Sequence, residues 1–205
     1  MINPKLKNKL KNKYLWISIG VLILGVMINQ SVSFYLESKY EELPVLNDAI
    51  LDVIPYYNLV WLFDLLWIIS TVSFGIYAYK KKKNWAFIIL VFGLSQMLRG
   101  LFIGMTPFGS PKINTVGLFN GSAFRMGVYP SGHTGTSYLA FLLSEGFMRY
   151  VFLALSVAVM VFLLLARGHY SVDIFSAIIF NYAICVFSRK YFSKFMDEVE
   201  DGSKN

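Results

Sequence analysis

The amino-acid sequence predicts an all-α protein, a polytopic membrane helical bundle with about six transmembrane helices. Its 205 residues are 56% hydrophobic and only 15% charged, whereas a water-soluble domain carries about 25% charged residues. The apolar residues form several runs long enough for a helix to cross the hydrocarbon layer. The sequence lacks the short alternating segments of a membrane β-barrel, and helices are the other structure that satisfies backbone polar groups in lipid.

Six predicted spans are separated by polar segments or by segments rich in glycine and proline. They form one membrane domain over residues 14–187, between a basic N-terminal segment (1–13) and a charged tail (188–205). The fourth span is the shortest. The spans are Tyr14–Tyr35, Tyr57–Tyr79, Asn84–Met105, Ser131–Ser144, Arg149–Ala166 and Ser171–Phe187.

The net charge of +7 comes largely from basic residues beside the apolar runs. Six spans place both termini on one side, together with the N-terminal lysines, the block Lys80–Lys83 and Arg149. The positive-inside rule assigns such a side to the cytoplasm. We therefore expect cytoplasmic termini and no nucleic-acid partner. The single cysteine, Cys185, lies inside the last span and excludes an intramolecular disulfide.

The chain has two histidines, and each is predicted at the outward start of a span. His133 ends the sequence Pro130-Ser131-Gly132-His133, in which serine is a good N-cap and glycine lets a ligand approach the backbone. Free N–H groups and the helix dipole favour an anion at such a position. The alternative is a plain turn followed by a structural histidine.

His169 and Asp173 are four residues apart, so on a helix they share one face and can hydrogen-bond. A carboxylate at one ring nitrogen fixes the tautomer and leaves the other nitrogen free to attack. A structural His–Asp pair is one alternative. A metal site that includes His133 is another, but a third strong ligand is not obvious, so no metal and no other cofactor is predicted.

Arg99 lies within the third predicted span, where a guanidinium is costly and indicates a function or a partner. Its planar fork suits phosphate, and it lies within two turns of the outward surface that both histidines share. The alternatives are that it extends to the interface or pairs with Asp64 of the second span.

In this order the motifs resemble the type 2 phosphatidic acid phosphatase superfamily. Its first motif is a Lys, six residues and Arg-Pro, and here Arg99 is followed after six residues by Thr106-Pro107. Its second motif, Pro-Ser-Gly-His, is present as Pro130–His133. Of its third motif only His169 and Asp173 match, because the two Ser-Arg positions hold Phe-Leu.

Within that superfamily the chain is similar to the sphingomyelin synthase branch. The branch has Ser-Gly-His-Thr and later His-Tyr-Thr with an Asp two positions on, and this chain has Ser131–Thr134 and His169–Ile174. A Leu-Pro segment followed by Asp ahead of the second span is similar to Leu43-Pro44 and Asp48. Pro130, and the lack of an acidic residue before Ser-Gly-His, are phosphatase-like.

The resemblance implies in-line displacement at the phosphorus of a phospholipid or sphingolipid at the extracytoplasmic face. His169, oriented by Asp173, would form a phosphohistidine. His133 would protonate the departing oxygen and then activate the acceptor. The groups expected to bind the phosphate are Arg99, Arg125, Arg167, Ser131 and Gly132.

The acceptor decides the reaction. A lipid hydroxyl gives transfer of a phospho-headgroup between lipids, as in sphingomyelin synthases, which the His-Tyr-Ser-x-Asp sequence favours. Water gives a lipid phosphate phosphatase. A metal-dependent membrane hydrolase and a non-enzymatic scaffold or transporter are further alternatives, and the sequence does not predict the oligomeric state.

Overall fold

The computed structural model describes residues 4–41, 43–81, 83–111 and 128–196, and this part of the chain contains helices and no β-strand. The all-α prediction is therefore confirmed. The elements are α1 (Pro4–Lys39), α2 (Ala49–Val53), α3 (Val60–Lys80), α4 (Trp85–Met105), α5 (Gly132–Leu142), α6 (Gly146–Leu165), α7 (Ser171–Tyr191) and the 3-10 helix η2 (Ser193–Phe195).

Five of the described helices are long and apolar enough to cross a membrane: α1 from Lys13 on, α3, α4, α6 and α7. All five expose large apolar side chains, as a helical bundle in lipid does. The predicted fourth span is shorter than a crossing helix. It corresponds to α5, whose 11 residues rise about 16 Å. The turn after it ends at Gly146, whose φ of 58° lies in the left-handed region that glycine adopts without strain.

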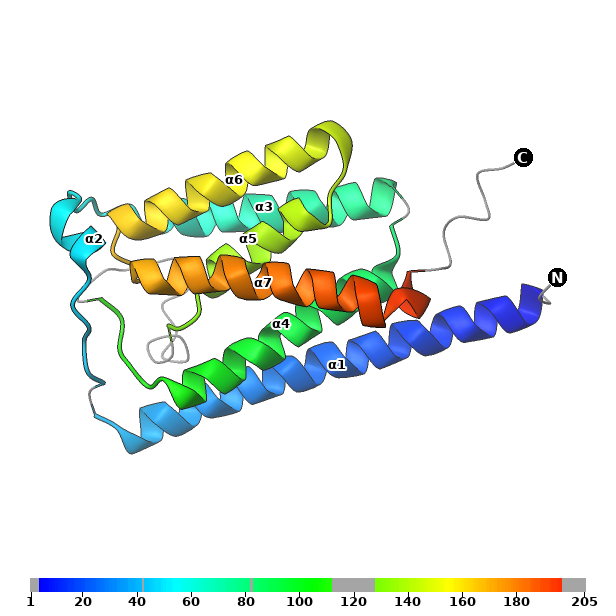
Figure 1. The fold of residues 1–205 in the computed structure, drawn as a ribbon, viewed down its shortest axis with the longest axis horizontal. Helices are drawn as coiled ribbons and strands as arrows, with labels where there is room; N and C mark the ends of the chain where they lie inside the picture. The colour runs from blue at the N-terminus through cyan, green and yellow to red at the C-terminus, as the bar shows by residue number, and fades with distance from the viewer. Residues whose placement is uncertain (1–3, 42, 82, 112–127, 197–205) are drawn as a thin grey trace.

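The short helix α5 lies inside the bundle, where it contacts α3, α4, α6 and α7. In Figure 1, α3 and α6 lie together on one side, α1 and α4 on the other, and α7 runs between the two pairs. Because consecutive long helices alternate in direction, α3 and α7 start, and α4 ends, toward the end of the bundle that carries α2, whereas the shorter α5 starts on that side but inside the bundle.

Glycines allow α1 and α4 to pack with their backbones in contact. A Cβ atom added at Gly25 would lie 2.5 Å from the Gly93 carbonyl oxygen, and one added at Gly93 would lie 2.7 Å from the backbone nitrogen of Leu22. Two turns further along α4, a Cβ atom added at Gly100 would lie 2.9 Å from the backbone of Asn29. Small residues are the usual means of close helix approach in lipid, and here they bring Asn29 to the helix that carries Arg99.

We expect Gly25→Ala to weaken the packing of α1 on α4 by about 1–3 kcal/mol, the range for overpacking a close contact. Gly20→Ala is the matched control, because nothing lies within 4 Å of a Cβ added at Gly20 on the same helix. Thermal unfolding in detergent would measure both variants. Equal melting temperatures for the two would contradict the assignment of a close backbone seam.

Candidate active site

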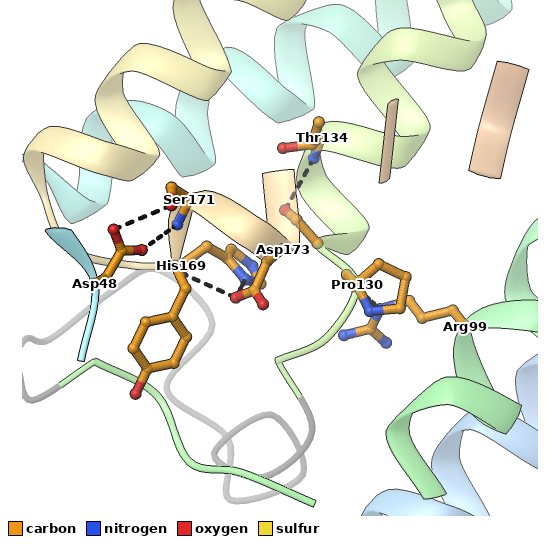
Figure 2. A network of polar contacts seen from close by, with 9 residues as sticks. Asp48, Arg99, Pro130, Thr134, His169, Ser171 and Asp173 are labelled. Atoms are coloured by element: carbon orange, nitrogen blue, oxygen red, sulfur yellow. Dashed lines mark hydrogen bonds and ion pairs between the residues drawn. The ribbon is translucent and has the colours of Figure 1, made fainter. Parts of the chain in front are cut away.

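His169 and Asp173 form a buried pair at the start of α7. The Nδ1 atom of His169 lies 3.1 Å from Oδ2 of Asp173, and the same oxygen accepts a hydrogen bond of 2.9 Å from the Tyr170 backbone N–H. The predicted pairing therefore exists. The two residues do not share a helix face, however, because α7 begins at Ser171 and His169 precedes it. Figure 2 shows the two side chains pointing toward each other.

His133 also contacts a carboxylate. Its Nε2 atom lies 3.3 Å from Oδ1 of Asp64, which is in the second turn of α3 and is buried. The imidazole ring meets Phe63 and Trp67 edge to face at centroid distances of 5.4 and 5.1 Å. Trp67 donates its indole N–H to the Thr136 hydroxyl at 2.5 Å. The α3 helix therefore fixes both the position and the plane of this ring.

The two imidazole rings converge, with centroids 6.1 Å apart and planes inclined at 63°. A backbone hydrogen bond of 3.1 Å from the Ser131 N–H to the Asp173 carbonyl joins the start of α5 to the first turn of α7. Within the described residues, Nδ1 of His133 and Nε2 of His169 have no hydrogen-bond partner. Each ring therefore has one nitrogen on a carboxylate and one available to a ligand.

Arg99 lies against the start of α5. Its Nε–H donates to the Pro130 carbonyl at 3.0 Å, and Nη1 donates to Oδ1 of Asn29 at 2.8 Å. A Cβ atom at Gly132 would lie 3.2 Å from the Arg99 Nε atom, so the glycine makes room for the guanidinium. The sequence left open a pairing of Arg99 with Asp64. The contact that the structure describes for the Asp64 carboxylate is the one with Nε2 of His133.

The first turn of α5 has the properties of an anion site. Ser131 caps the helix by accepting a 3.3 Å hydrogen bond from the Thr134 N–H. The N–H groups of Gly132 and His133 have no partner in the part of the chain that the structure describes. Free N–H groups at a helix start attract phosphate.

No family model matches the chain, and a search of curated proteins found no match.

Two predicted phosphate ligands are not brought into this group by any described contact. Arg125 lies outside the described residues. Arg167 stands two residues before His169 with a φ of 52°, an uncommon conformation for a residue with a side chain. The hydrogen bonds and ion pairs of the described residues do not involve its guanidinium.

A clamp that the sequence did not reveal holds the loop of His169. The Asp48 carboxylate caps α2 through the Ile50 and Leu51 N–H groups and also accepts 2.6 and 3.0 Å hydrogen bonds from the backbone and hydroxyl of Ser171. The Tyr170 hydroxyl accepts from the Leu46 N–H at 3.0 Å. The segment before α2 thus fixes the two residues that follow His169.

Burial raises the pKa of Asp48, but the hydrogen bonds from Ser171, Leu51 and Ile50 lower it by more, so its pKa lies below the ordinary value of 3.8. A carboxyl with a lowered pKa in the folded state stabilises the fold above its unfolded pKa, and this contribution is lost as the pH falls through the folded value. We expect Asp48→Asn to lower the melting temperature at pH 7, with the gap to wild type closing below about pH 4. Melting curves across pH would check this, and a gap unchanged at pH 3 would contradict it.

Proposed function

We propose that the protein is a membrane-embedded lipid phosphoester enzyme that works through a phosphohistidine. The observation that carries the proposal is the convergence of two imidazoles, 6.1 Å apart, each with one ring nitrogen on its own carboxylate. One histidine with a carboxylate is a common structural pair. Two such His–carboxylate pairs that face each other beside a guanidinium and a helix start can provide a nucleophile, a general acid and an anion-binding site.

In the proposed reaction, Nε2 of His169 attacks the phosphorus while Asp173 stabilises the charge that develops on the ring. The bond from phosphorus to the lipid oxygen breaks, and protonated His133 gives its proton to that oxygen. An acceptor hydroxyl then attacks the phosphohistidine and loses its proton to His133. Arg99 and the N–H groups at Gly132 and His133 stabilise the charge on the equatorial oxygens.

The surroundings favour a lipid substrate. Arg99 is six residues from the end of α4 and Asp64 is four residues from the start of α3, so the site is about 6–9 Å below the helix ends. The opposite end of the bundle carries Lys80, Lys81 and Arg149. By the positive-inside rule we infer that this end is cytoplasmic and that the site lies at the extracytoplasmic face.

His169→Ala should reduce turnover of a phospholipid by at least about a thousandfold, because the covalent step is lost. The wild-type protein should yield an acid-labile phosphoprotein on rapid quenching, labelled at His169 and not at His133. Vanadate, which mimics five-coordinate phosphorus, should inhibit it. A His169→Ala protein with near-native activity in detergent would refute the mechanism, and activity that chelators abolish but vanadate leaves intact would support a metal-dependent hydrolase.

We propose headgroup transfer between lipids as the reaction and hydrolysis of a lipid phosphomonoester as the second candidate; the His-Tyr-Ser-x-Asp sequence from His169 to Asp173 favours transfer. Incubation of the purified protein with headgroup-labelled phospholipid, with and without ceramide or diacylglycerol, separates them. Transfer predicts a labelled second lipid that appears only with the acceptor. Label released only as free phosphate or phospho-headgroup would establish hydrolysis, and no turnover of any phospholipid would favour a scaffold or transporter.

A further inference from the structure

We propose that Asp64 is the positioning residue of the acid–base histidine, and that the two histidines are held in opposite tautomers. This inference rests on the proposed function, which it deepens by assigning the reacting nitrogen of each ring. The geometry is asymmetric: the carboxylate of Asp173 lies at Nδ1 of His169, whereas the carboxylate of Asp64 lies at Nε2 of His133.

A carboxylate accepts a hydrogen bond, so the ring nitrogen beside it carries the proton when the imidazole is neutral. Neutral His169 is therefore the Nδ1–H tautomer, and its bare Nε2 is the nucleophile. Neutral His133 is the Nε2–H tautomer, and its bare Nδ1 receives the acceptor's proton. When His133 is protonated, the leaving oxygen takes the proton from Nδ1, and the proton on Nε2 remains hydrogen-bonded to Asp64.

The surroundings of Asp64 are those of a positioning group. The side chain is 5% exposed, and a carboxylate buried in a membrane helix needs a partner or a role. Its helix also supplies Phe63 and Trp67, which meet the His133 ring on its edge or face. One turn and a half of α3 thus sets the tautomer, the plane and the position of the acid–base ring.

The tautomers give a test that does not depend on activity. The chain contains only two histidines, so ¹⁵N NMR of the histidine-labelled protein, at a pH where both rings are neutral, should show one Nδ1–H and one Nε2–H imidazole. A His133→Gln variant assigns the two signals and should retain the Nδ1–H one. Two rings of the same tautomer, or an Nδ1–H tautomer at His133, would overturn the assignment.

Asp64→Asn provides the kinetic test, because it removes the charge but keeps a hydrogen-bond acceptor. Loss of an oriented acid should slow reaction of a lipid, whose leaving alkoxide needs a proton, by roughly 10²- to 10⁴-fold. It should leave nearly unchanged the first-turnover burst of nitrophenolate from p-nitrophenyl phosphorylcholine or p-nitrophenyl phosphate, since nitrophenolate leaves without a proton. The phosphohistidine should then accumulate, because the same ring activates the acceptor.

Asp52→Asn, an exposed aspartate on α2, is the matched control and should behave like wild type. Combining Asp64→Asn with His133→Ala should be no worse than His133→Ala alone, because both remove one function. If Asp64→Asn does not fold, Asp64→Glu keeps the charge one methylene further out and should show a smaller loss on the lipid with an intact burst.

The two proposals fail differently. An equal loss on the lipid and the nitrophenyl ester, or no loss on either, with wild-type turnover still dependent on His169, would overturn the role of Asp64 alone. A wild-type protein that turns over neither substrate and forms no phosphohistidine would overturn the enzymatic function and the role of Asp64 with it.

Discussion

The candidate site depends on the hydrogen bond from the Ser131 N–H to the Asp173 carbonyl. It joins the first turns of two helices whose histidine motifs are 36 positions apart in the sequence, and it sets the relative height of the two rings. Glycine permits the approach: a Cβ atom at Gly135 would lie 2.7 Å from the Asn181 side chain of α7. Because α5 is surrounded by four helices, this junction cannot shift without moving the core of the bundle.

Under the proposed mechanism, the charge balance of the site bears on the acid role assigned to His133. Among the described groups, the site holds the carboxylates of Asp64 and Asp173 and the guanidinium of Arg99. With both imidazoles neutral their formal sum is −1, which opposes an anionic phosphate in a low-dielectric environment. Protonation of one imidazole brings the sum to zero, so in the proposed mechanism a phosphate and the proton that its departing oxygen needs would favour each other.

The sequence predicted the helical class, and it predicted the residues that form the two histidine motifs, because hydrophobic run length, an N-cap serine and a four-residue His–Asp spacing are local signals. It did not predict the partners that come from other helices. Asp64 is a single charge in an apolar run, and run length alone cannot tell whether it faces Arg99 or His133. The resemblance drew attention to Asp48 but gave it no partner, and its contact with Ser171 is visible only in the fold.

The fourth predicted span shows how tertiary structure overrides a count of apolar residues. A helix of 11 residues cannot cross the hydrocarbon layer, and at its far end Glu145 pairs with Lys83 at 2.5 Å, at the basic end of the bundle. A helix anchored there and rising about 16 Å must begin inside the bundle rather than at its other surface. Its free N–H groups and His133 are therefore held at a depth between the helix ends. For the proposed function, that depth suits the phosphate of a lipid that stays in the bilayer better than a phosphate dissolved in water.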